Sequence, residues 1–388
     1  MLKSVKMSHL SAGFSTVLIG YASAVIIVIQ AASVLGASES QIESWLLTLG
    51  LIMGLSSMGL SWRYKTPILT AWSTPSAALL VGVGAQYDIY TATGAFILVG
   101  IATLITGLIK PVCKAIEEIP PALGSAMLAA ILLPFCMSAF NVAQSAPSYF
   151  AILFCALCVS KLIAPKFTMF ILLGLSIVLA MSSGAFSQTT FNFSISSFEV
   201  FPPEFNVSAL LNLAIPLYLV TMLSQNLSGI AMMQSYGYTA PVKPILIGTG
   251  VINMMAAQFG GFSLNLAAIS AAMCMTEEVD SKKGNRYRAV IWAGLFYILA
   301  GLLATSVVSI FVAFPSEVTQ MLAGFALLGT LLMCLQSAFS NARYREASLL
   351  TFLVTLSGIS FLGLNAIIWG LLFGWFYASL MNKKAENS

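Results

Sequence analysis

Long, nearly uninterrupted apolar runs recur along this chain, and they constrain its fold more than any other feature. Each run is about as long as a helix that spans a bilayer, which needs about 20 residues. Only 8% of the 388 residues are charged, against about 25% in soluble domains, so a soluble enzyme is excluded. Barrel strands have about ten residues and alternate in polarity, which excludes a β-barrel. The sequence predicts an all-α polytopic membrane protein with about 14 transmembrane segments.

The limits of the apolar runs give approximate limits for these spans. We predict spans at 10–35, 41–62, 66–84, 89–110, 119–140, 146–162, 167–184, 207–235, 241–259, 262–276, 288–313, 317–338, 347–361 and 363–381. The third and tenth are short or interrupted. The first, at about 26 residues, is too long for the h-region of a signal peptide, so no cleavable signal is expected.

All 17 Lys and Arg residues lie in one alternating set of the loops and tails that these spans define. They are Lys3, Lys6, Arg63, Lys65, Lys110, Lys114, Lys161, Lys166, Lys243, Lys282, Lys283, Arg286, Arg288, Arg343, Arg345, Lys383 and Lys384. The opposite loops carry the acidic residues Glu39, Asp88, Glu199, Glu204 and Glu317. Because cytoplasmic loops accumulate Lys and Arg, we expect both termini to be cytoplasmic, in a bacterial inner membrane.

The longest stretch without a strong apolar run, residues 185–206, divides the predicted spans equally. Residues 1–184 contain seven predicted spans and residues 207–388 contain seven more. An odd number of spans in each half means that the halves enter the membrane from opposite sides. This arrangement predicts a 7+7 inverted repeat, the architecture of many secondary transporters.

Corresponding spans of the two halves, the third and the tenth, carry similar interruptions. Span 3 contains WSTPSAA at 72–78, and span 10 contains FSLNLAA at 262–268. Both follow a stretch that forms helix poorly, with Pro67 before the first and Gly260-Gly261 before the second. We interpret both as discontinuous helices. The alternative is that Pro75 and the two glycines are ordinary kinks, which are common in membrane helices.

A discontinuous helix would begin near the midplane of the membrane in each half. Thr74-Pro75 fits an N-cap followed by the first helical residue, and in span 10 Ser263 or Asn265 could cap. Two helix N-termini that point toward each other offer free N–H groups and the positive ends of two dipoles. They would form an anion-binding site near Ser73, Thr74, Ser263 and Asn265 without a buried cation.

Polar residues inside spans 1 and 8 could complete such a site. Span 8 carries Gln225 and Asn226, and span 1 carries Tyr21, Ser23 and Gln30. Polar groups at membrane depth are costly unless they face protein or a water-filled cavity. They either line the site or form hydrogen bonds between helices, and the residues alone leave both readings open.

The remaining distinctive residues indicate packing or anchoring. Gly50-x-x-x-Gly54 is typical of close helix packing, and the six cysteines lie in or beside apolar runs. The single histidine, His9, lies at the start of span 1 and suggests no role in function. We expect no cofactor, metal site or nucleic-acid partner. Four tryptophans near span ends are predicted interfacial anchors: Trp45, Trp62, Trp292 and Trp375.

Three stretches of the chain are distinctive: QNLSGIA at 225–231 with Gly237-Tyr238 after it, FGGFSLNLAAI at 259–269, and the first span with Gly20-Tyr21 and Gln30. Together they resemble the benzoate/proton symporter family. The resemblance covers essentially the whole chain, although Ser228 stands where that family would have Pro. The family is in turn similar to the uracil-permease and sulfate-transporter superfamily. That similarity implies a core of spans 1–4 and 8–11 that moves against a gate of spans 5–7 and 12–14.

The resemblance also implies a function. We expect import of benzoate or a close analogue, with a proton, by alternating access. The carboxylate would bind at the two helix N-termini, the ring would pack against Trp72 and Phe262, and Gln225 and Asn226 would offer neutral hydrogen bonds. The lipid bilayer is the expected environment, and a homodimer is one assembly that we consider.

Alternatives to this function remain. The same fold could carry a nucleobase or an inorganic anion, or form a passive anion channel. A membrane-embedded enzyme lacks support, because one terminal histidine and no acid in the middle of a span leave no catalytic cluster. The proton carrier is also open: the substrate carboxylate or Glu43 could carry the proton, or coupling could be absent.

Overall fold

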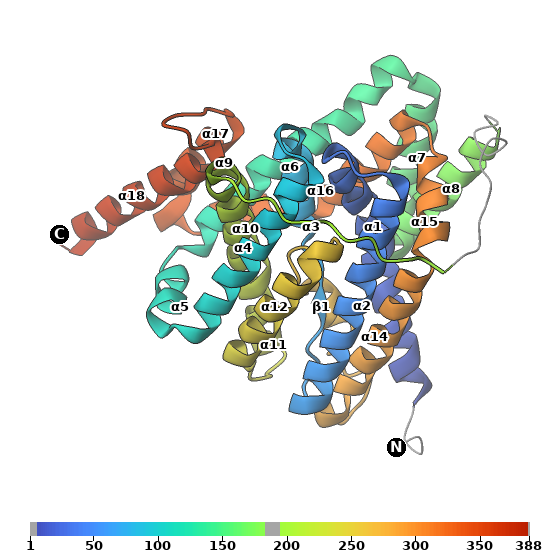
Figure 1. The fold of residues 1–388 in the computed structure, drawn as a ribbon, viewed down its shortest axis with the longest axis horizontal. Coiled ribbons are helices and arrows are strands. Elements are labelled where there is room, and N and C mark those ends of the chain that lie inside the picture. Colours follow the sequence, from blue (N-terminus) through green and yellow to red (C-terminus); the bar gives the residue numbers. More distant parts are fainter. Residues whose placement is uncertain (1–5, 183–194, 387–388) are drawn as a thin grey trace.

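The computed structural model describes residues 6–182 and 195–386, and helices make up most of both ranges (Figure 1). The first range contains α1 (Met7–Val34), α2 (Glu39–Tyr64), β1 (Thr70–Ala71), α3 (Thr74–Val83), η2 (Gly84–Gln86), α4 (Ile89–Leu108), α5 (Lys110–Glu117), α6 (Pro121–Ser145), α7 (Pro147–Ile163), η3 (Pro165–Phe167) and α8 (Thr168–Ser182). The second contains α9 (Val207–Ala209), η5 (Leu210–Ala214), α10 (Ile215–Val220), η6 (Thr221–Asn226), α11 (Leu227–Ser235), α12 (Val242–Ala256), η7 (Ala257–Phe259), β2 (Asn265–Leu266), α13 (Ile269–Ala272), η8 (Lys283–Asn285), α14 (Tyr287–Leu302), α15 (Ala304–Val312), α16 (Ser316–Ser340), η9 (Ala342–Tyr344), α17 (Arg345–Leu356) and α18 (Ala366–Glu386).

Within the described ranges, six helices are long and apolar enough to cross a membrane, and two bent helix pairs raise the number to eight. One bent pair joins α14 and α15, where the axis turns by 60°. The other predicted spans are shorter helices or the two broken segments, and each predicted span has a counterpart whose limits agree within a few residues. Span 8 is a single helix, Val207–Ser235, that contains the two π-helical turns η5 and η6.

Helices of one half pack against helices of the other half in pairs. α2 lies along α14, α12 lies along α4, and α6 lies along α16. Glycines allow the close approach: a Cβ on Gly50 would lie 2.6 Å from the Cα of Gly301, and one on Gly250 would lie 2.9 Å from the oxygen of Gly100. The prediction that Gly50 and Gly54 mediate close packing is confirmed. An inverted repeat exchanges spans 2 and 9 and spans 4 and 11, so the first two pairs are equivalent.

The two broken spans meet in the middle of the molecule. β1 and β2 pair antiparallel, with Thr70 opposite Leu266 and Ala71 opposite Asn265. Each strand replaces part of a helix, and the predicted interruptions of spans 3 and 10 are therefore confirmed. The strands are short and surrounded by helices, and all of their residues except the half-buried Ala71 are buried.

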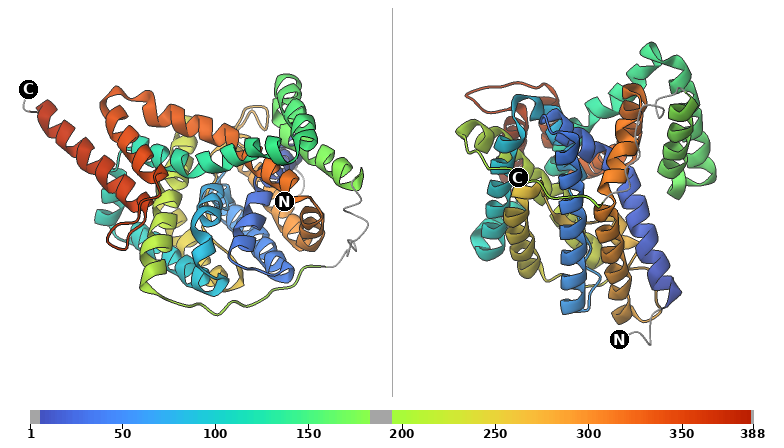
Figure 2. Two further views of the ribbon diagram at one scale, coloured as in Figure 1. Left: turned by 90° about the horizontal axis from the view of Figure 1, so that it is seen from above. Right: turned by 45° about the vertical axis from the view of Figure 1, so that its right-hand side comes forward.

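The last two helices of each half form a pair, and the two pairs lie on opposite sides of the molecule. α7 and α8 pack together, as do α17 and α18. Figures 1 and 2 show the first pair on one side of the molecule and the second pair on the other.

Residues 195–206 run as an extended segment across one face of the helices rather than as a loose loop (Figure 1). The amide of Phe201 donates to the carbonyl of Gln258 (2.7 Å), and that of Glu204 donates to the carbonyl of Tyr90 (3.0 Å). The Phe201 side chain is fully buried. The segment thereby covers the ends of helices from both halves. Residues 185–194 of the predicted loop, and the last two residues of predicted span 7, lie outside the described part of the chain.

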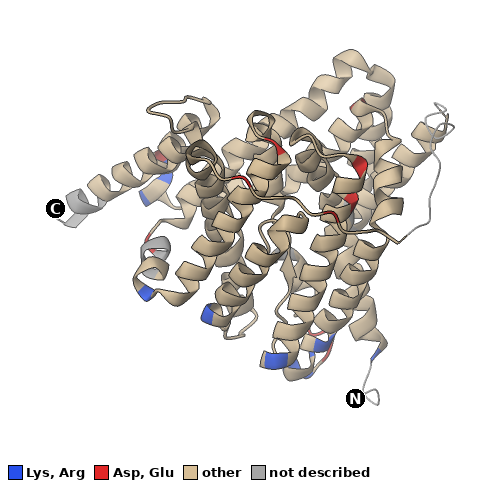
Figure 3. Ribbon diagram, viewed as in Figure 1, with Lys and Arg blue, Asp and Glu red and all other residues tan. Residues whose placement is uncertain are grey.

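In Figure 3 the Lys and Arg residues lie mainly along the lower edge of the molecule and, at the left, beside α17 and α18. At the lower edge the sole histidine is buried: Nε2 of His9 lies 3.0 Å from Oδ2 of Asp280, which also forms an ion pair with Lys6 at 3.0 Å. Arg286 donates through Nε to the carbonyl of Asp280 (2.8 Å). This cluster fixes the start of α1 to the segment that follows α13.

One predicted anchor is wrong. Trp45 is fully buried, and its ring packs 5.7 Å from that of Phe96 and 5.2 Å from that of Phe262, between centroids. Its position near the end of span 2 resembled an interfacial site, but residues 195–206 and α12 cover that end. Trp62 and Trp375, by contrast, are exposed.

Candidate functional site

The helix that follows the first break begins as a capped helix. The hydroxyl of Ser73 accepts a hydrogen bond from the amide of Ser76 (3.1 Å), so Ser73 is the N-cap and Thr74 is the first helical residue. The prediction that Thr74 caps is wrong by one residue, because Pro75 fits within the first turn rather than at its first position. The backbone N–H groups of Ser73 and Thr74, at the start of α3, donate no hydrogen bond to any described residue.

The second break differs in its local geometry. Gly260 has φ of 91° and Ser263 has φ of 45°, so the chain turns through left-handed conformations before β2. The helix that follows, α13, has only four residues and no side-chain cap. Neither Ser263 nor Asn265 caps it, and the side-chain Nδ2 of Asn265 instead donates to the carbonyl of Ser263 (2.7 Å). The prediction of a cap at either residue is wrong, because the helix starts further along the chain, at Ile269.

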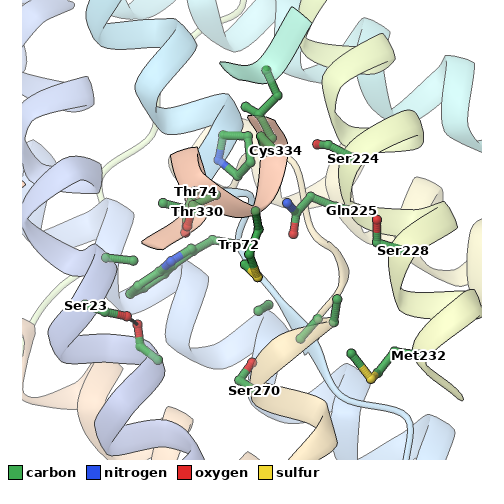
Figure 4. A pocket seen from close by; sticks show the side chains of 18 of the residues that line it. Ser23, Trp72, Thr74, Ser224, Gln225, Ser228, Met232, Ser270, Thr330 and Cys334 are labelled. Carbon is green, nitrogen blue, oxygen red and sulfur yellow. Dashed lines mark hydrogen bonds between the residues drawn. The ribbon is translucent and has the colours of Figure 1, made fainter. Parts of the chain in front are cut away.

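A cavity of about 450 Å³ lies where the two breaks meet spans 1 and 8 (Figure 4). That volume falls in the range of small-molecule sites, about 300–1,000 Å³. The broken spans and spans 1 and 8 supply one wall, and α6 and α16 supply the other. The lining residues are Ile19, Gly20, Ser23, Ala24, Ala71, Trp72, Thr74, Pro75, Ser125, Leu128, Ser224, Gln225, Ser228, Met232, Ala267, Ala268, Ser270, Met273, Tyr297, Ala326, Thr330, Met333, Cys334 and Ser337.

Four of the predicted site residues line this cavity: Ser23, Trp72, Thr74 and Gln225. Figure 4 shows Trp72 on the α1 side and Gln225 on the side of span 8. Gln225 belongs to the π-helical turn η6, and such turns are frequent at functional sites. These four residues come from spans 1, 3 and 8. No predicted site residue of span 10 lines the cavity.

The other predicted residues lie behind the cavity wall. Phe262 is fully buried against Trp45 and Phe96, because the turn at Gly260 directs it away from the cavity. The Tyr21 ring lies behind Trp72, with centroids 5.1 Å apart. The side chains that complete the set but do not line the cavity are Gln30, Ser73, Asn226, Ser263 and Asn265.

Asn226 has a different role from the one predicted. Its Oδ1 accepts a hydrogen bond from the amide of Leu266 (3.1 Å), and its side chain is fully buried. It therefore satisfies the backbone of β2 instead of facing a ligand. Its neighbour Gln225 faces the cavity because successive helical residues point in different directions.

The wall that α6 and α16 contribute was not predicted from the sequence. Thr330, Cys334 and Ser337 follow an i, i+4, i+7 spacing on α16, and the hydroxyl of Ser125 on α6 donates to that of Ser337 (2.9 Å). This spacing places the three side chains on one helix face and is the signal that could have identified them. Small polar residues in an otherwise apolar span gave no other indication.

The cavity is uncharged. No residue that lines it is acidic or basic, so it contains no fixed charge to repel an anion or to compete with a ligand. Among the described residues, no group of three or more His, Cys, Asp or Glu side chains could hold a metal ion. What the wall offers is hydroxyl groups, one carboxamide, the start of α3 and aromatic and thioether surface.

The model of a protein family described as benzoate membrane transport protein matches residues 3–380. The chain belongs to this family. The match extends over both halves, including both broken spans and the cavity. The family consists of membrane transporters, so the chain is a multi-pass membrane transport protein.

Two relatives match over their whole lengths. The inner membrane protein YdcO of Escherichia coli is 38% identical over 387 residues, which are 100% of this chain and 99% of the relative. The benzoate membrane transport protein of Acinetobacter baylyi is 34% identical over 392 residues, again 100% of this chain and 99% of the relative.

Solved structures with a similar fold are anion transporters. The murine Solute Carrier 26 family member A9 anion transporter in the inward-facing state has a TM-score of 0.66 at 12% identity, over 99% of this chain and 69% of that chain. The transmembrane domain of a cyanobacterium bicarbonate transporter, BicA, has a TM-score of 0.59 at 14% identity, over 96% of this chain and 97% of that chain. These similarities show the fold, and they confirm the predicted all-α 7+7 inverted repeat.

Proposed function

We propose that the protein imports an aromatic carboxylate, benzoate or a close analogue, across a bacterial inner membrane. The observation that carries this proposal is the uncharged cavity, in which an indole ring and a free helix start lie on one wall. Membership of the benzoate transport family and the name of the Acinetobacter baylyi relative support the choice of cargo.

The carboxylate would bind at the start of α3. The amide of Thr74 has no acceptor within the described protein, and the positive end of the helix dipole lies there. The aromatic ring would pack against Trp72, and Gln225, which lies on the same wall, would donate a neutral hydrogen bond. α13 is a single turn, so the binding energy for the carboxylate would come mainly from the first half.

Alternating access would move one group of spans against the other. The core of spans 1–4 and 8–11 supplies the wall that contains Trp72 and Gln225, and the gate of spans 5–7 and 12–14 supplies the wall that contains Thr330 and Cys334. Because the cavity lies between the two groups, their relative movement would open it to one side of the membrane and then to the other. The position of most Lys and Arg along the lower edge of the molecule supports cytoplasmic termini (Figure 3).

Uptake by purified protein in proteoliposomes tests the cargo. We expect labelled benzoate to enter with saturation, and excess unlabelled benzoate to compete where uracil and sulfate do not. Equal competition by sulfate would indicate an inorganic-anion transporter, and competition by uracil a nucleobase transporter. Uptake that rises linearly with concentration would indicate a channel.

A charge placed on the cavity wall tests the binding mode. The variant Q225E keeps the shape of the side chain and adds a negative charge, so it should abolish uptake of a carboxylate. The matched control is Q258E, because Gln258 is an exposed glutamine in η7, the turn that follows α12. Full uptake by Q225E would exclude a carboxylate near Gln225.

Proton coupling is part of the proposal, with two carriers. Either the substrate carboxylate carries the proton or Glu43 does; Oε2 of Glu43 accepts a hydrogen bond from Thr305 (2.7 Å) near the outer end of α2. An imposed pH gradient, acidic outside, should accelerate uptake by the native protein. If the variant E43Q keeps the acceleration by the pH gradient, the substrate carries the proton. If the acceleration is lost in E43Q, Glu43 carries the proton. No effect of the gradient on the native protein would exclude coupling.

A further inference from the structure

A broken span creates a problem for its own backbone. The residues between the helical parts have N–H and C=O groups with no partner in the same helix, and a membrane interior offers no water to replace them. The pairing of β1 with β2 satisfies only one edge of each two-residue strand. The other edge of each strand needs partners from neighbouring helices.

Two serines of α2 provide these partners in the first half. Ser61 accepts a hydrogen bond from the amide of Ile68 (3.0 Å) and donates one to its carbonyl (3.0 Å). Ser57 accepts from the amide of Thr70 (2.9 Å) and lies 3.3 Å from its carbonyl as a donor. Each serine therefore serves both backbone polar groups of one residue in the extended stretch 68–71, which ends in β1.

The spacing of these contacts matches a helix to a strand. Four residues of helix advance about 6 Å, and two residues of strand advance about 6.6 Å. Ser57 and Ser61 therefore lie on one face of α2, opposite residues 70 and 68, which lie on one edge of an antiparallel segment.

The second half contains the same device with different residues. Oδ1 of Asn253, on α12, accepts from the amide of Leu264 (2.7 Å), and its Nδ2 donates to the Leu264 carbonyl (3.1 Å). Asn226 then accepts from the amide of Leu266. α12 is span 9, the counterpart of span 2 in the inverted repeat, so the helix that precedes each break holds the strand that follows it.

Ser57, Ser61 and Asn253, which we call the clamp residues, do not line the cavity. The side chains of Ser57 and Ser61 are fully buried, and Asn253 is 1% exposed. However, the strands that they hold lead directly into the cavity wall, through Trp72 in the first half and Ala267 in the second. A shift of either strand would move the surface on which a ligand rests.

We propose that Ser57, Ser61 and Asn253 are positioning residues that hold the broken spans at the geometry required for ligand binding. The proposal rests on the proposed function where it concerns affinity, but the clamp itself can be tested without a substrate. It makes α2 and α12 the rigid templates of the two halves.

Hydrogen–deuterium exchange of the reconstituted protein tests the clamp. The variants are S57A, S61A and N253L, and S57T keeps the hydroxyl. The control is T249V: Thr249 is buried on the same helix as Asn253, but its hydroxyl donates to the carbonyl of Ile245 in its own helix (2.9 Å). We expect exchange to accelerate by about tenfold in residues 66–71 of S57A and S61A and in residues 262–267 of N253L, and to remain unchanged in T249V and S57T.

Uptake measurements on the same variants test the positioning role. We expect the KM for benzoate to rise by about tenfold in S57A and N253L, with a smaller change in the maximal rate, and recovery in S57T. Exchange in S57A equal to that in T249V would overturn the clamp, whether or not N253L folds. Faster exchange with an unchanged KM would overturn the positioning role. If the native protein takes up no aromatic carboxylate, the proposed function fails, while the exchange result still decides the clamp.

Discussion

The break before α3 is built around a capped helix, whereas the break before α13 is built around glycine and left-handed backbone. In the first, Ser73 caps ten helical residues and leaves a free amide at the cavity. In the second, Gly260 and Ser263 turn the chain at positive φ, and a single helical turn follows. The paired strands nevertheless occupy equivalent positions in the two halves.

The two breaks therefore share a backbone path but not the side chains that line the cavity. Trp72 and Thr74 of the first half line the cavity with large and polar groups. The equivalent stretch of the second half contributes Ala267, Ala268 and Ser270, which are small. In the proposed binding mode, the first break therefore offers contacts to a ligand, and the second break leaves room for it. The following substitutions test this division, from the largest expected effect to the smallest.

The glycine at the second break should be indispensable. A Cβ on Gly260 would lie 1.7 Å from Cδ1 of Trp45, at a φ of 91° that other residues rarely adopt. We expect G260A to abolish folding. In the first half, a Cβ on Gly82 would meet no atom closer than 3.9 Å, so G82A should fold normally. The yield of monodisperse protein after gel filtration measures both, and a folded G260A would contradict the proposed role of this turn.

The two aromatic residues at equivalent positions should separate stability from affinity. Phe262 is fully buried beside Trp45, so F262A should lower the free energy of unfolding by about 3–5 kcal/mol. Trp72 lies on the cavity wall, so W72A should raise the KM for benzoate by about tenfold or more. Thermal unfolding and uptake kinetics of both variants check this. An unchanged KM in W72A would remove Trp72 from the binding site.

An aspartate follows each broken span, and the two should respond differently to pH. Burial alone would raise the pKa of Asp280, but hydrogen bonds from the Lys282 amide, Lys6 and His9 outweigh it and lower the pKa to about 2. Asp88 is exposed and is the N-cap of α4. The hydrogen bond that it accepts from the Thr91 amide lowers its pKa.

Because the folded-state pKa of Asp280 is depressed, its carboxylate stabilises the fold above its unfolded pKa, about 3.9, and this contribution is lost as pH falls toward about 2. We expect D280N to lose about 1–3 kcal/mol at neutral pH, because His9 and Lys6 lose a charged partner. The difference from the native protein should shrink as pH falls through this window. D88N is the control, since Asn caps a helix about as well as Asp. Thermal unfolding as a function of pH measures both, and a pH-independent loss in D280N would exclude this account.

The smallest changes in stability should come from substitution of Ser73 and Ser263, the serines that follow Trp72 and Phe262. S73A removes the cap of α3 and should cost about 1 kcal/mol. The hydroxyl of Ser263 is buried and has no hydrogen-bond partner in the described protein, so S263A should leave stability within about 0.5 kcal/mol. Thermal unfolding of the two variants checks this order. Equal losses would mean that the two breaks depend on capping alike.

Much of the fold could be predicted because it depends on local composition. Apolar length and the distribution of Lys and Arg predict spans, and the repeated WSTPSAA and FSLNLAA patterns predict both breaks. The site was predicted less completely. Trp72, Thr74, Gln225 and Ser23 line the cavity, but Phe262 and Asn226 have other roles, and the α16 face with Thr330 was missed.

The sequence alone determined that the chain crosses a membrane repeatedly and that its third and tenth spans are interrupted, because helix length, charge and the conformational limits of Pro and Gly are properties of short stretches. Tertiary structure decided which polar side chains face a ligand and which serve the backbone. Asn226 and Gln225 are neighbours, yet one binds the Leu266 amide and the other lines the cavity. That choice depends on which unpaired backbone group lies within hydrogen-bonding distance, and only the packing of distant segments fixes those distances.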